Sequence, residues 1–195
     1  MDSTTLAFLA GAAGPLLFIG LLAGSLHISR RRKHRGFLRE RFGDEFDRLA
    51  RQYGSERAAM RDLDRRLARV RSYRLRRMSA DDVQTLTLEW QQTEVAFGDN
   101  PSIALLKADQ LVTRAAQACG YRSRDAETCV DDLSVSFPAQ AATHRAAREM
   151  FQRNARASSS PDLLWHALVL YREVFDVLLA ADATISGAHK QVNQW

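Results

Sequence analysis

The sequence contains few of the side-chain arrangements from which catalytic and metal sites are usually built. Its 195 residues include only two cysteines, Cys119 and Cys129, and its five histidines form no pair at the i, i+4 spacing of a helical metal site. It has no glycine-rich phosphate loop and no Gly-x-Ser-x-Gly nucleophile elbow. We therefore predict no enzyme activity, no cofactor and no metal. We expect both cysteines to be buried small hydrophobes or idle thiols in a reducing cytoplasm.

Only three carboxylates stand out as candidate site residues. Asp131 and Asp132 are adjacent at the end of a short predicted helix, where we expect a solvated corner rather than a cation site or paired catalytic carboxylates. Asp109 falls between Leu105 and Val112 on the buried side of its predicted helix, where it needs an Arg, Tyr or backbone partner. We interpret Asp109 as a structural polar hub, with a site residue as the alternative.

Charge is absent from residues 6–28, a run of 23 residues of which eleven are Leu, Ile or Phe. As a helix this run would be about 35 Å long, enough to cross about 30 Å of bilayer hydrocarbon. We predict a transmembrane anchor within residues 1–29. A cleaved secretory signal is the alternative, but only Asp2 precedes the run, where such a signal has basic residues.

Basic residues gather directly behind the apolar run. An excess of Lys and Arg on one flank holds that flank in the cytoplasm, which predicts an outside N-terminus and a cytoplasmic C-terminal domain at the cell membrane. Basic side chains at this position are attracted to the anionic inner leaflet. The predicted contacts to lipid headgroups are Arg30, Arg31, Arg32, Lys33 and Arg35.

The charge after the anchor is divided unevenly. Residues 30–77 contain 18 Lys or Arg and 7 Asp or Glu, a net charge of +11, whereas residues 78–195 contain 10 and 15, a net charge of −5. The basic part predicts a juxtamembrane helical stalk, 30–77, with two helices in near continuity and a kink at Gly54. Its seam would lie on the membrane, pair with a copy or pack on the domain behind it. That seam consists of Phe42, Phe46, Leu49, Tyr53, Met60, Leu63, Leu67 and Val70.

Residues 78–181 predict a small helical domain, followed by a flexible tail, 182–195. Ser79 with Asp82 resembles a capping box, and Asn100 before Pro101 opens a helix that Gly120 ends. Shorter helical signals cover 125–133 and 138–155, and the last helix follows Pro161. We expect that helix to be central because of its apolar stripe, and the whole fold to be all-α. The stripe is Leu164, Leu168, Tyr171, Phe175 and Leu178.

Several short motifs give the chain a family resemblance over about residues 30–180. It resembles a family of bacterial single-pass membrane proteins usually called hypothetical or putative secreted proteins. The family tends to have His-Pro after its Leu-Ser-Val run, where this chain has Phe137-Pro138, and a Tyr-Arg pair in place of His144-Arg145. The resemblance implies the architecture and no activity. Its motifs are residues 41–48, Trp90 with Phe97, Asp99 and Pro101, 108–112, Gly120-Tyr121, 133–135 and Tyr171-Arg172.

These patterns favour a membrane-anchored interaction or scaffold module with an unidentified protein partner. A membrane-tethered nucleic-acid binder rests on the basic stalk alone and lacks a recognition motif, so we expect no nucleic-acid partner. An enzyme would need side chains to converge from separate helices. Gly20 and Gly24 form a small-xxx-small step, which is compatible with a homodimer through anchor and stalk. The charge of the stalk opposes close pairing and favours the alternative, a stalk folded back on its own domain or lying on the membrane.

Overall fold

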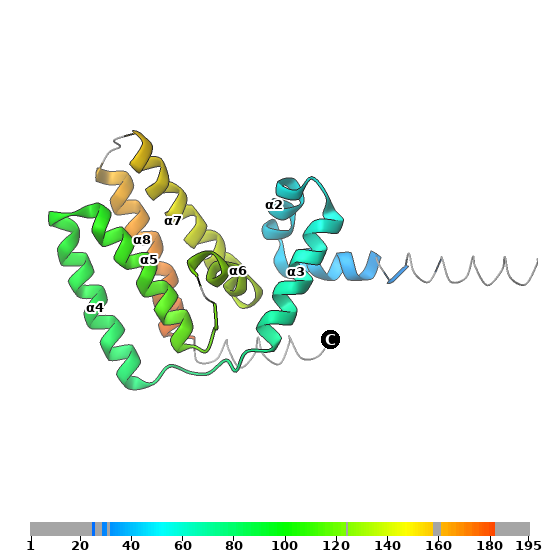
Figure 1. The fold of residues 1–195 in the computed structure, drawn as a ribbon, viewed down its shortest axis with the longest axis horizontal. Helices are drawn as coiled ribbons and strands as arrows, with labels where there is room; N and C mark the ends of the chain where they lie inside the picture. The colour runs from blue at the N-terminus through cyan, green and yellow to red at the C-terminus, as the bar shows by residue number, and fades with distance from the viewer. Residues whose placement is uncertain (1–24, 26–28, 31, 124, 158–160, 182–195) are drawn as a thin grey trace, which may run out of the picture. The chain divides into compact units, whose positions relative to one another are not determined.

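The computed structural model describes residues 25, 29–30, 32–123, 125–157 and 161–181 (Figure 1). These residues are helical with connecting turns and contain no strand, so the predicted all-α fold is confirmed. None of the helices among them is long and apolar enough to cross a membrane. Apart from Ser25, the predicted anchor at residues 6–28 lies outside the described part, as does the predicted tail.

The chain divides into two compact units, Met1–Gly43 and Asp44–Trp195. In the first unit residues 32–42 are helical. The second unit contains α2 and α3 as well as the later helices, so the division falls near residue 44 and not near residue 78, where the sequence analysis placed it. Most of the predicted stalk therefore belongs to the same compact unit as the helical domain.

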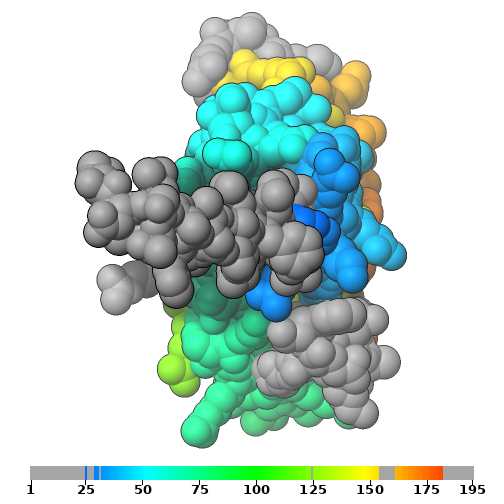
Figure 2. All heavy atoms as spheres, turned by 90° about the vertical axis from the view of Figure 1, so that its right-hand side faces the viewer, coloured from blue at the N-terminus to red at the C-terminus, as the bar shows by residue number. Residues whose placement is uncertain are grey.

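The helices α2 (Asp44–Tyr53) and α3 (Glu56–Arg71) form an antiparallel hairpin, whose atoms lie at the surface in cyan in Figure 2. Gly54 has φ +62°, and the amide of Ser55 donates to the carbonyl of Ala50 at 3.1 Å. This is the hydrogen-bond pattern of a glycine-terminated helix, in which the left-handed residue turns the chain away. The prediction of two nearly continuous helices with a kink is wrong, because the chain reverses at Gly54.

Local capping chemistry sets the ends of α4 (Ala80–Asp99) and α5 (Pro101–Ala118) as predicted. The Ser79 hydroxyl accepts from the amide of Asp82 at 3.0 Å, and the Asn100 side chain accepts from the amide of Ile103 at 3.1 Å. Side-chain oxygens at these positions satisfy amides that have no partner within the helix. Gly120 then ends the segment with φ +95°.

The remaining helices are α6 (Ala126–Ser136), α7 (Pro138–Ala157) and α8 (Pro161–Leu179). α8 packs against both α5 and α7, and its predicted apolar stripe is buried, which confirms the buried face of this helix. Trp90 of α4 is buried and stacks on Phe175 of α8 with a centroid distance of 4.6 Å. α6 lies against α7 and also against α3, so it connects the α2–α3 hairpin to the other helices.

Candidate functional site

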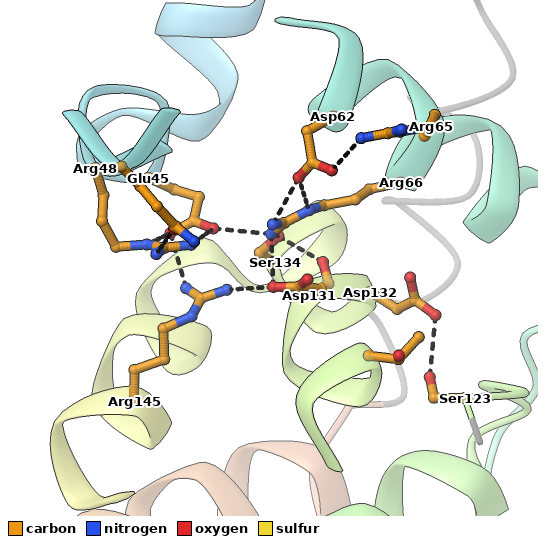
Figure 3. A network of polar contacts seen from close by, with 12 residues as sticks. Glu45, Arg48, Asp62, Arg65, Arg66, Ser123, Asp131, Asp132, Ser134 and Arg145 are labelled. Atoms are coloured by element: carbon orange, nitrogen blue, oxygen red, sulfur yellow. Dashed lines mark hydrogen bonds and ion pairs between the residues drawn. The ribbon is translucent and has the colours of Figure 1, made fainter. Parts of the chain in front are cut away.

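The most distinctive feature of the second unit is a network of charges, some buried and some partly exposed, where α2, α3, α6 and α7 meet (Figure 3). Each helix contributes at least one member, and the members are separated by up to 100 residues in the chain. We call this set the buried charge network. It consists of Glu45, Arg48, Asp62, Arg66, Arg69, Asp131, Asp132 and Arg145.

Arg66 of α3 lies at the centre of the network and is only 2% exposed. Its guanidinium lies 2.8 Å from Oε1 of Glu45, 2.7 Å from Oδ2 of Asp62 and 2.9 Å from Oδ1 of Asp131. The planar, permanently charged guanidinium can satisfy several acceptors at once, which a lysine ammonium does less well. The burial of Arg66 is thus matched by carboxylates from α2, α3 and α6.

Glu45 of α2 is the carboxylate with most cationic partners. It accepts hydrogen bonds from Arg48, Arg66 and Arg145, each at 2.8 Å for the closest pair of atoms. Burial alone would raise the pKa of Glu45, but its hydrogen bond with Arg48 and the positive charges of Arg145, Arg48 and Arg66 lower the pKa below its ordinary value of 4.5. Glu45 is therefore held as a carboxylate that joins α2 to both α3 and α7.

Asp131 shares its partners with Glu45 and shows the opposite shift. Its Oδ1 lies 2.9 Å from both Arg66 and Arg145. Burial raises the pKa of Asp131 despite the two guanidiniums, and burial also lowers the pKa of Arg145. The ion pairs of Asp131 thus offset only part of the cost of removing its carboxylate from water.

Asp132 anchors the second part of the network and is 0% exposed. Arg69 lies 2.6 Å from its Oδ1, and the hydroxyls of Tyr73 and Ser123 donate to its Oδ2 at 2.7 and 3.0 Å. Burial and the adjacent carboxylate together raise the pKa of Tyr73 to about 12, so Tyr73 acts as a hydrogen-bond donor at physiological pH. The expectation of a solvated corner is wrong for Asp132, which is fully buried beneath Arg69 and Tyr73. Asp131 is partly exposed and is engaged by Arg66 and Arg145.

Asp109, which the sequence analysis interpreted as a polar hub, lies outside this network. Its Oδ1 is 2.9 Å from Nε2 of His144 and 3.9 Å from Nε of Arg148. Burial raises the pKa of Tyr171, and the nearby charge of Asp109 raises it further. The rings of His144 and Tyr171 meet edge to face at 5.2 Å. The surroundings of Asp109 thus include Arg and Tyr side chains, and also a histidine that sequence reasoning did not name.

The predicted headgroup contacts lie in the first compact unit. Arg30, Arg32, Lys33 and Arg35 are exposed, and Arg31 lies outside the described residues. They are neighbours along the chain.

A polar pocket of about 310 Å³ opens beside the buried charge network. Its lining has three basic side chains, Arg48, Arg145 and Arg148, and three acidic ones, Glu127, Asp131 and Glu149. The charges balance, so the pocket favours neither an anion nor a cation. No His, Cys, Ser or Lys lines it. Among the described residues, no group of His, Cys, Asp and Glu side chains is arranged to hold a metal ion.

Three members of the network, Glu45, Arg66 and Arg145, were not among the candidate residues predicted from the sequence. A signal for Arg66 was present, because position 66 lies on the apolar stripe formed by Leu63, Leu67 and Val70. A charged residue on such a stripe needs a buried partner, which is the same reasoning that selected Asp109. The identity of the partners could not be inferred, because they come from other helices.

The chain was compared with known protein families, curated protein sequences and solved structures. No protein-family model matches the chain, and no curated protein sequence or solved structure matches it at a significant level. The main feature of the described residues is therefore the ion-pair network itself, which fixes one helical hairpin to the rest of a helical unit.

Proposed function

We propose that this chain is a single-pass membrane protein of the bacterial family that it resembles, whose helical unit serves as an interaction or scaffold module at the cytoplasmic face. The observation that carries the proposal is the uncharged run at residues 6–28 followed at once by Arg30, Arg31, Arg32, Lys33 and Arg35. An apolar run of this length spans a bilayer, and the basic flank stays in the cytoplasm.

The helical unit supports a role in binding rather than in catalysis. The carboxylates and guanidiniums of the buried charge network are paired with one another over 2.6–2.9 Å, and the polar pocket beside them has no His, Cys, Ser or Lys in its lining, while its Asp131 carboxylate is held by Arg66 and Arg145. A catalytic constellation needs a nucleophile or a general base directed at a space for substrate. The network instead holds α2 and α3 against α6 and α7.

In this structure most of the predicted stalk seam is not accessible as a pairing surface for a homodimer. Phe46, Leu49, Leu63, Leu67 and Val70, which belong to the predicted stalk seam, are buried within the chain itself. They are not available to a second copy in this arrangement. We therefore propose pairing through the anchor alone, where Gly20 and Gly24 would let two helices approach closely.

A topology assay tests the proposal. A reporter that is active only outside the cytoplasm, fused after Trp195, should be silent, while a cytoplasmic reporter at the same position should be active. Strong activity of the external reporter would reverse the orientation and favour a cleaved signal. Crosslinking and pull-down of the full-length protein from membranes should then recover a protein partner, and a matched chain with residues 6–28 replaced by an unrelated anchor should recover the same one.

A further inference from the structure

The helix α3 has two faces of different chemistry. Its inner face is buried and consists of Ala59, Leu63, Arg66, Leu67 and Val70. Its outer face carries Arg57, Arg61, Arg65 and Ala68, which are all exposed and are spaced four, four and three residues apart. Residues at this spacing lie on one side of a helix. The outer face of α3 is therefore a row of arginines directed at solvent.

These arginines differ from the arginines of the buried charge network. Arg65 pairs with Asp62 at 2.9 Å, but its side chain remains 71% exposed. Among the described residues, Arg57 and Arg61 form no ion pair with an acidic side chain. A guanidinium without an internal partner keeps its capacity to bind an external anion, and it suits the oxygens of a phosphate group.

We propose that the outer face of α3, through Arg57, Arg61 and Arg65, binds the phosphate groups of anionic phospholipids at the membrane surface. This inference rests on the proposed membrane anchor and extends it to a second, separate contact. Since the apolar face of α3 is covered by other helices, the helix does not insert into the bilayer as an amphipathic helix would. The contact is electrostatic and lies at the level of the headgroups.

The length of the tether favours lipid over nucleic acid as the source of phosphate. Asp44, the first residue of the second unit, lies sixteen positions after Ile28, the end of the predicted anchor. Even fully extended, such a segment reaches only about 55 Å, and as a helix only about 24 Å. The α2–α3 hairpin is the first part of the second unit after this tether. The tether therefore raises the effective concentration of lipid headgroups around the hairpin.

A fluorescence quenching experiment on the full-length chain tests this contact. Ala68→Cys places a label on the outer face of α3, and Cys119 and Cys129 are buried and do not compete for the reagent. The protein is reconstituted in vesicles of phosphatidylcholine, with or without phosphatidylglycerol, that contain a lipid with a spin-labelled headgroup. We expect quenching several-fold stronger with phosphatidylglycerol than without it, and loss of the difference at about 1 M salt. A label at Val95→Cys on α4, 79% exposed, should report the same quenching in both vesicles.

Charge variants separate the proposed face from the general charge of the protein. Arg57→Gln, Arg61→Gln and Arg65→Gln together should remove the effect of phosphatidylglycerol. The matched control, Lys107→Gln, Arg122→Gln and Arg153→Gln, removes the same charge from other exposed positions and should retain it. Unchanged circular dichroism spectra show that both variants are folded.

The outcomes distinguish this inference from the proposed function. Equal quenching in both vesicles, or quenching that persists in the first variant, overturns the lipid contact while the anchor stands. Added nucleic acid that abolishes the quenching overturns it as well, because the face then prefers another phosphate. A protein that does not float with the vesicles after washing at high salt refutes the anchor itself.

Discussion

A substitution at Arg66, the central residue of the buried charge network, is the most direct test of how much the network contributes to stability. Arg66→Met keeps most of the apolar stem and removes the guanidinium that contacts Glu45, Asp62 and Asp131. Removing one partner of a buried ion pair usually costs about 3–5 kcal/mol, because the remaining charge stays buried without compensation. Glu45 and Asp131 keep contacts with Arg145, and Asp62 keeps Arg65. We therefore expect a loss at the lower end, about 3 kcal/mol in the free energy of unfolding.

The neighbouring residue supplies a matched control. Arg65→Met removes the same charge one position earlier, but the Arg65 side chain is mostly exposed and, among the described residues, pairs only with Asp62 (Figure 3). An exposed pair contributes less than about 1 kcal/mol. Urea denaturation of the full-length protein in a mild detergent, followed by circular dichroism, measures both variants. In a thermal melt the loss for Arg66→Met corresponds to about 6–12 °C for a unit of this size.

The stability loss expected for Arg66→Met should depend on pH, because two carboxyl groups of the network have shifted pKa values. The guanidiniums lower the pKa of Glu45 in the folded state, so its contribution to stability is present above about 4.5 and is lost as the pH falls through the lowered value. Burial raises the pKa of Asp131, so protonation of Asp131 in acid favours the folded state. The deficit of Arg66→Met should thus be full at neutral pH and shrink in acid. Equal losses for the two variants, or a deficit that does not change with pH, would refute a stabilising role of the network.

Three further predictions concern packing and boundaries. Leu168→Ala should lower the unfolding free energy by about 2–5 kcal/mol in urea denaturation, because Leu168 is 2% exposed; a loss under 1 kcal/mol would contradict the buried face of α8. Gly120→Ala should lower it by about 1–3 kcal/mol, since Gly120 has φ +95° and an added Cβ would clash with the carbonyl oxygen of Arg74, whereas Gly98→Ala should be neutral or slightly stabilising. A fragment consisting of residues 44–195 should melt cooperatively in calorimetry. It should melt at a higher temperature than a fragment of residues 78–195, because the shorter fragment lacks the basic partners of Asp131 and Asp132. Equal melting temperatures would contradict this prediction.

Helix boundaries could be read from the sequence wherever they depend on a few adjacent residues. The caps at Ser79 and Asn100 and the end at Gly120 are set by hydrogen bonds that span three or four residues. Gly54 was recognised as a break by the same chemistry. The reversal of the chain there was missed, because the apolar spacing runs through Gly54 without a change of register and is equally consistent with a continuous helix.

The buried charge network could not be predicted in the same way. The burial of Asp132 depends on Arg69, 63 residues away, and on Tyr73, 59 residues away. Nothing near Asp132 in the sequence shows that α3 will cover it. The net charge of residues 30–77 is consistent with ion pairs to the acidic part of the chain and equally with membrane contact, and only the three-dimensional arrangement shows which carboxylates are engaged.

The position of Glu45 in the chain has a mechanical consequence. Tension applied through the N-terminus enters the second unit at Asp44, one residue before the carboxylate that joins α2 to α3 and α7. The hydrogen bonds within these ion pairs form only over short distances, so a displacement of a few ångström at this point breaks them and admits water. Under load, the hairpin would be the first element to separate, while the apolar contacts of α8 with α5 and α7, which are more distant along the chain, would stay intact. The unit would yield stepwise from its N-terminal end.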